Sequence, residues 1–146
     1  MPTAAKMVAA LLFAGLALAA AGMVEPLYPD GVVGPRFGWL NAAIGLVVGW
    51  LILGVRAGQG YVTAVGVGLT TAAALALWSL FLFSFAQMID RSLDKRYDGP
   101  VEALVDVFRF MWENAQIVAV QEVLLALAIG GALIGMLVEF TSHHWR

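Results

Sequence analysis

Residues 61–89, YVTAVGVGLTTAAALALWSLFLFSFAQMI, contain no charged side chain. At a rise of 1.5 Å per residue, a helix of these 29 residues would be about 43 Å long, whereas the hydrocarbon core of a bilayer is about 30 Å thick. We therefore predict a membrane-spanning helix whose last turns tilt or project beyond the core.

The composition of the whole chain is also typical of a membrane protein. The 146 residues are 62% hydrophobic and 12% charged, with a mean hydropathy of +0.88, whereas soluble domains are about a quarter charged. The net charge of −2 gives no reason to expect a nucleic-acid partner. The absence of cysteine excludes disulfides, thiolate metal sites and thiol redox chemistry.

Three further apolar segments approach the roughly 20 residues that a spanning helix requires. They predict helices at about 4–24, 39–55 and 115–140, so the expected fold is a single all-α membrane domain with four transmembrane helices. The turn RAGQG at 56–60 is short enough to make the second and third helices antiparallel neighbours. Four crossings place both termini on one side.

The first of these helices has a second interpretation. Lys6, the apolar run after it and the small residues Ala17, Ala19 and Ala21 are also typical of a cleavable signal peptide. We favour a spanning helix, because the run is long for a signal core.

Residues 90–113, DRSLDKRYDGPVEALVDVFRFMWE, hold ten of the eighteen charged residues. Gly99-Pro100 predicts the start of an amphipathic interfacial helix over about 100–113, between the third and fourth spans. Its apolar face would carry Val101, Leu104, Val105, Phe108, Met111 and Trp112, with Glu102, Asp106, Arg109 and Glu113 opposite and Phe110 on the polar side.

This predicted helix has two possible roles. It could be a connector that rests in the interface or caps its own bundle, or it could dock a partner protein through Asp106, Arg109, Phe110 and Glu113. Helices that bind anionic lipid carry Lys and Arg on the polar face, whereas this face has three acids and one arginine. The expected partners are therefore the bilayer and either a larger membrane protein complex or a homo-oligomer.

Small residues predict where the spanning helices pack. Gly45 with Gly49 and Gly131 with Gly135 are spaced four apart, which lets helix backbones approach closely. They would serve contacts within the bundle or an oligomer interface. We expect the polar residues of the third helix to form interhelical hydrogen bonds: Thr63, Thr70, Thr71, Ser79, Ser84 and Gln87.

Glu122 is the candidate ionisable residue at membrane depth. If the fourth helix begins near Ala115, Glu122 lies about 10 Å along it; if the span begins at Val123, Glu122 is a boundary acid.

The end of the chain holds the other possible ligands. Glu139, His143 and His144 have partial metal-ligand spacing, but interfacial anchoring with Trp145 and Arg146 explains them better. Both histidines lie at the chain end, so we expect no haem held at mid-membrane and no other cofactor. Nucleotide-binding, metalloprotease and nucleophile-elbow motifs are missing from the sequence, so we do not expect an enzyme.

Several segments resemble the small bacterial membrane proteins of the TrgA-type tellurium-resistance family. They are MPTAAK at 1–6, NAAIGLVVGW at 41–50, RAGQGY at 56–61, AVGVGLTTA at 64–72 and, most specifically, RSLDKRYDGPVEA at 91–103. The resemblance covers nearly the whole chain and implies a multi-pass bacterial inner-membrane protein linked to tellurite resistance. It implies no catalytic residues. A chain without cysteine cannot reduce tellurite through its own thiols, so protection would be indirect or through transport.

Two functions remain open from the sequence. The first is a non-catalytic accessory factor that binds or stabilises another membrane protein. The second is a small oligomeric transporter using Glu122. Small drug exporters use a carboxylate within the first helix, where this chain has none between Met7 and Val24, and this difference favours the accessory factor.

The charges beside the spans bear on orientation. Counting Lys and Arg favours a cytoplasmic location for the loops that hold Arg36, Arg91, Lys95, Arg96 and Arg109, over the side with Lys6, Arg56 and Arg146. Lys6 before the first helix, with Glu25 and Asp30 after it, favours cytoplasmic termini, and we expect this arrangement.

Overall fold

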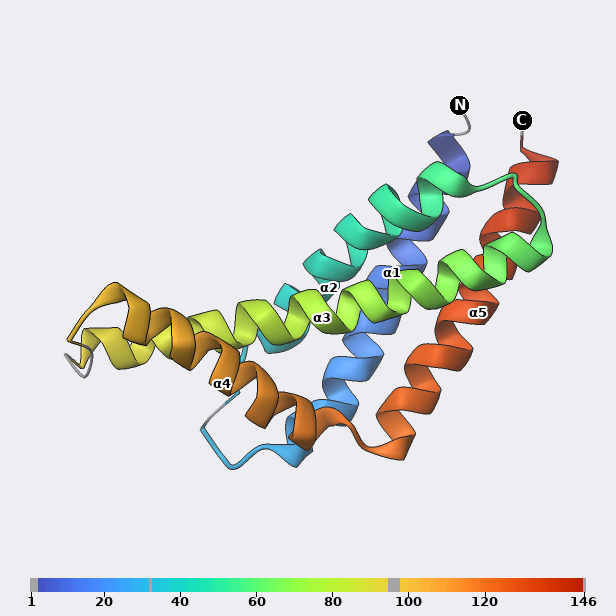
Figure 1. The fold of residues 1–146 in the computed structure, drawn as a ribbon. Coiled ribbons are helices and arrows are strands. Elements are labelled where there is room, and N and C mark those ends of the chain that lie inside the picture. The colour runs from blue at the N-terminus through green and yellow to red at the C-terminus, as the bar shows by residue number, and fades with distance from the viewer. Residues whose placement is uncertain (1–2, 32, 95–97, 146) are drawn as a thin grey trace.

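The computed structural model describes residues 3–31, 33–94 and 98–145, which form helices and connecting turns without a strand. The α-helices are α1 (Thr3–Val24), α2 (Phe37–Val48), α3 (Tyr61–Leu93), α4 (Pro100–Val118) and α5 (Gln121–His144) (Figure 1). A 3-10 turn, Glu25–Leu27, prolongs α1. A π-helical turn, Gly49–Leu53, and a 3-10 turn, Gly54–Arg56, prolong α2.

Four segments are long and apolar enough to cross a membrane: Thr3–Leu27, Phe37–Arg56, Tyr61–Leu93 and Gln121–His144. This confirms the predicted all-helical fold with four candidate spans and is compatible with a multi-pass membrane protein. The 33 residues of α3 correspond to about 50 Å, longer than a bilayer core. Its second half extends away from α1 and α5 and packs beside α4 (Figure 1).

The two ends of the chain lie at the same end of the helix bundle (Figure 1). There α1 begins, α5 finishes and the turn from α2 to α3 passes beside Glu139. At the opposite end, Val24, Tyr28 and Val123 form a small apolar cluster that includes the end of α4. The main core lies between these ends, with Phe13, Leu53, Leu75 and Val138 among its buried side chains.

Backbone contact between α1 and α2 depends on the predicted glycine pair. A Cβ atom on Gly49 would lie 2.6 Å from the carbonyl oxygen of Ala9, and one on Gly45 would overlap the carbonyl oxygen of Phe13. The facing stripe of α1 repeats every fourth residue and is fully buried: Ala5, Ala9, Phe13, Ala17 and Ala21. Ala17 and Ala21, which also fit a cleavage signal, therefore serve close helix packing, as small residues at this spacing do.

A second close contact joins α3 to α5. Cβ atoms on Gly131 and Gly135 would meet the backbone carbonyl oxygens of Gly68 and Ala64, and one on Gly68 would meet that of Gly131. Gly68 was not among the predicted packing residues. All four glycines proposed from the sequence therefore lie at contacts within one chain, between α1 and α2 or between α3 and α5.

The predicted boundary before the fourth span is wrong. The segment that begins near Ala115 belongs to α4, which continues to Val118, and α5 begins at Gln121. Ala119 leaves the helical conformation and Val120 is extended, with φ −88° and ψ 150°. The last turn of α4 persists because Ile117 and Val118 pack against the apolar cluster at this end of the bundle.

Candidate functional site

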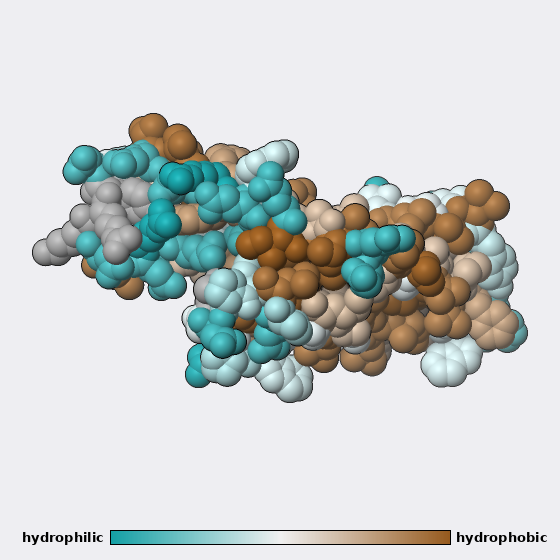
Figure 2. All heavy atoms as spheres, turned by 90° about the horizontal axis from the view of Figure 1, so that it is seen from below, coloured by the Kyte–Doolittle hydropathy of each residue, from teal (hydrophilic) through white to brown (hydrophobic). Residues whose placement is uncertain are grey.

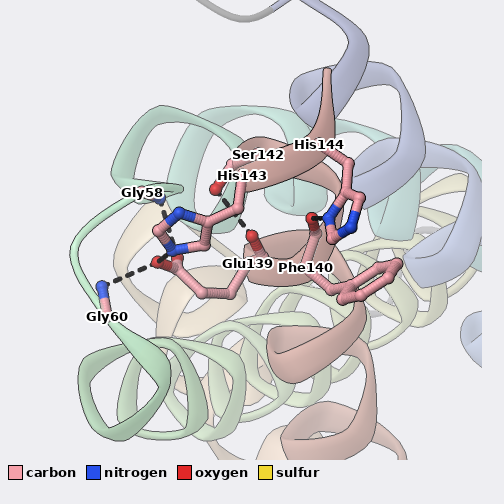
Figure 3. Close-up of polar contacts among 7 residues, drawn as sticks. All are labelled: Gly58, Gly60, Glu139, Phe140, Ser142, His143 and His144. Carbon is pink, nitrogen blue, oxygen red and sulfur yellow. Dashed lines mark hydrogen bonds and ion pairs between the residues drawn. The ribbon is translucent and has the colours of Figure 1, made fainter. Parts of the chain in front are cut away.

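Glu139 is the most deeply buried carboxylate among the described residues, at 1% exposure near the end of α5. Its two oxygens accept hydrogen bonds from the backbone N–H groups of Gly58 and Gly60, each with an N···O distance of 2.7 Å (Figure 3). Both glycines have positive φ, +94° and +104°, which favours glycine because it has no Cβ. The carboxylate thereby fixes the turn between α2 and α3 against α5.

His143 completes this carboxylate clamp, as we call the set of Gly58, Gly60, Glu139 and His143. Nε2 of His143 lies 3.0 Å from Oε1 of Glu139, and the His143 ring stacks on Tyr61 at 6.1 Å between centroids. His144 instead lies 3.0 Å from the carbonyl oxygen of Phe140 (Figure 3). In the described part of the chain, no three His, Cys, Asp or Glu side chains group as metal ligands would. The clamp satisfies buried polar groups and has the features of a structural site.

A second polar site pins α4 to the rest of the molecule. The Asn114 side chain, 3% exposed, accepts a hydrogen bond from the Tyr28 hydroxyl at 3.1 Å. Its amide nitrogen donates to Ser84 Oγ at 3.1 Å and to Gln87 Oε1 at 2.9 Å. Ser84 and Gln87 therefore form the interhelical bonds expected of them. Thr70 and Thr71 do not, because each donates to a carbonyl of its own helix, four residues earlier.

The contacts of α4 with α3 correct the predicted docking set. Phe110, placed on the outer polar face by the sequence pattern, is 6% exposed, and the Arg91 guanidinium lies 4.6 Å from its ring centroid. Asp106, expected to face water, lies 3.7 Å from Arg91, with its side chain 16% exposed. Arg91 offsets the cost of burying these two side chains between the helices, because it supplies an opposite charge to Asp106 and a cation–π contact to Phe110. Only Arg109 and Glu113 of the set point outward, as an exposed ion pair at 3.2 Å.

The side chains that α4 turns outward are mostly large and apolar. The outward stripe, as we call it, consists of residues that are each 57% exposed or more: Val101, Leu104, Val105, Phe108 and Trp112. Their spacing places them along one side of the helix. Seen from below, hydrophilic residues gather where α3 ends and α4 begins, while hydrophobic residues dominate much of the remaining face (Figure 2). Met111 is partly buried and lies outside the stripe.

Glu122 lies in the first turn of α5 and is exposed. It therefore has the position of a boundary acid, the alternative that followed from a span beginning near Val123. The corrected start of α5 is the reason, because Glu122 is then the second residue of the helix.

Comparisons with family models, curated proteins and solved structures yield no match to the chain. The candidate sites therefore depend on their geometry alone. The carboxylate clamp and the Asn114 network have their polar atoms occupied within the chain. Among the described residues, no side chain covers the outward stripe, so the stripe is the candidate for binding another molecule.

Proposed function

We propose that the protein is a non-catalytic accessory factor of a bacterial inner membrane that binds another membrane protein through α4. The observation that carries the proposal is the outward stripe, presented by a helix that Asn114 and Arg91 hold in one orientation. In this account α4 is an amphipathic helix at the membrane interface. A surface fixed in advance loses less conformational entropy on binding than a mobile one.

The charges beside the stripe favour a protein over an anionic lipid surface. Interfacial lipid-binding helices carry Lys and Arg on the polar face. Here Glu102 and Glu113 are exposed, and the exposed Arg109 is engaged by Glu113 at 3.2 Å. An apolar centre with a charged rim is the usual composition of a protein interface, with aromatic anchors such as Phe108 and Trp112 supplying most of the energy.

The resemblance to the TrgA-type proteins extends the proposal to tellurite resistance. We propose that resistance depends on the bound partner, since the chain has no cysteine with which to reduce tellurite. With cytoplasmic termini, the turn after Arg56 is cytoplasmic and the connection after Arg96 is on the periplasmic side. Reporter fusions at these two positions test the orientation.

Two variants in the native host test the proposed function. Phe108→Ser with Trp112→Ser should leave the protein inserted and folded, because both side chains are more than 60% exposed, but should remove a copurifying membrane protein and lower tellurite resistance. Val62→Ser is the matched control, since Val62 is 91% exposed at the other end of α3. Unchanged copurification in the double variant would contradict the proposal. A homo-oligomer that retains resistance without a second protein would favour the transporter.

A further inference from the structure

A groove of about 670 Å³ lies between α2 and α3. Its walls are almost entirely apolar and include Leu40, Ile44, Val47, Leu51, Trp78 and Leu82. Both helices belong to candidate membrane spans, so the groove would open to the hydrocarbon of the bilayer. Its volume is in the range of small-molecule sites, about 300–1,000 Å³.

Ser79, one of the residues that line the groove, has a buried hydroxyl whose hydrogen-bonding capacity is unused. Within residues 3–31, 33–94 and 98–145, Ser79 Oγ is the buried side-chain polar atom without a hydrogen-bond partner. Asn41 lines the groove beside it and donates to the carbonyl oxygen of Phe37 at 2.9 Å, which leaves its second N–H group for another acceptor. Ser79 and Asn41 also line a smaller cavity of about 70 Å³ on the side of α1. The polar pair therefore lies where the groove meets the interior of the bundle.

We propose that the groove is a specific lipid site, in which one acyl chain of a glycerolipid lies along α2 and its ester carbonyl accepts a hydrogen bond from Ser79. Asn41 lies four residues after the start of α2, about 6 Å along the helix, and α2 with its turns covers the roughly 30 Å of a bilayer core. If Phe37 marks one boundary of the core, Asn41 lies about 6 Å inside it, just below the ester groups of a lipid, and the apolar wall leads from there toward the bilayer centre.

A transmembrane helix of another protein fits this groove less well. Each carbonyl group of a helix already accepts one hydrogen bond from its own helix and keeps only its second lone pair, which lies close to the helix surface between side chains. An ester carbonyl has no such internal donor and is available to the Ser79 hydroxyl. Water is also a poor occupant, because the surrounding walls are apolar.

The test uses the purified protein and does not depend on any protein partner, so its failure leaves the proposed function of α4 untouched. Native mass spectrometry would compare retention of a phosphatidylethanolamine with two ester-linked chains and its diether analogue, which lacks both carbonyls. We expect one retained lipid and about a fivefold preference for the ester, the effect of one hydrogen bond.

Two variants with matched controls assign the site. Ser79→Ala removes an unpartnered hydroxyl, so the fold should persist while the ester preference disappears; Thr70→Val removes a hydroxyl that bonds within its own helix and should change nothing. Ala43→Trp fills the groove and should abolish retention, whereas Ala73→Trp, at an exposed alanine outside it, should not. Equal retention of ester and ether lipids by the unmodified protein, or an ester preference that survives Ser79→Ala, would overturn the proposal.

Discussion

Glu139 and Gly58, 81 positions apart in the chain, are joined by a hydrogen bond of 2.7 Å between a buried carboxylate and a backbone N–H group. The same carboxylate binds Gly60 and lies beside His143. A negative charge near the C-terminal end of a helix interacts unfavourably with the helix dipole. The hydrogen-bond donors around Glu139 offset this cost.

Replacing Glu139 with glutamine should destabilise the protein by about 1–3 kcal/mol, because the amide has one acceptor oxygen where the carboxylate has two, and one of the two glycine N–H groups loses its charged acceptor. Denaturant titration in mild detergent measures the change. Glu122→Gln is the control, since Glu122 is exposed in the same helix and should change stability little. Equal effects of the two variants would show that the clamp does not stabilise the turn.

Two glycines of α3 should respond differently to the same substitution. Gly68→Ala places a methyl group against the backbone of Gly131 and should destabilise the protein by about 1–3 kcal/mol. A Cβ on Gly66 meets nothing within 4 Å, so Gly66→Ala should be neutral or slightly stabilising through helix propensity. The comparison uses thermal unfolding in one detergent. A loss of stability in Gly66→Ala as large as in Gly68→Ala would argue against close packing of α3 on α5.

Asn114→Ala should loosen α4 without disrupting the four spanning helices. The substitution removes the acceptor of Tyr28 and the donor to Ser84 and Gln87. Amide hydrogen exchange should therefore accelerate in Pro100–Val118 and stay unchanged in the middle of α5. If the amides of α4 stay as protected from exchange as in the unmodified protein, Arg91 and the apolar contacts are enough to hold α4 against α3.

Burial raises the pKa of Tyr28 from 10.0 to about 12. Because the protonated phenol is favoured in the folded state, this contribution to stability is complete below pH 10 and is lost as the pH rises toward 12. Absorbance near 295 nm should show a late phase of tyrosine ionisation near pH 12. Tyr28→Phe should remove that late phase. If the alkaline titration of this variant is unchanged, the late phase does not belong to Tyr28.

The spans could be predicted from the sequence because uninterrupted apolar runs have few structural alternatives. The Gly45–Gly49 and Gly131–Gly135 pairs were identifiable by spacing alone. The end of α4 could not be identified in this way, because AQIVAVQ at 115–121 has no glycine or proline to mark a break. The break at Ala119 depends instead on packing against Val24 and Val123.

The orientation of α4 was predicted incorrectly in part. The hydrophobic face of a helix is expected to turn toward a protein core, but beside a membrane it can turn outward. In α4 the side chains of α3 determine which face turns inward. Phe110 on the polar side was the available signal, since a large aromatic there has to be buried by something. The carboxylate clamp also had a signal in Glu139 near the end of an apolar helix, but its partners are backbone groups, which no side-chain pattern reveals.

Photocrosslinking from α4 in living cells tests the central claim most directly. With p-benzoylphenylalanine in place of Phe108, which is 61% exposed, we expect one discrete adduct with another membrane protein. The same group in place of Phe110, which is 6% exposed and faces α3, should give no such adduct. Lipid adducts alone from position 108, or the same protein adduct from both positions, would contradict the proposal that α4 docks a partner.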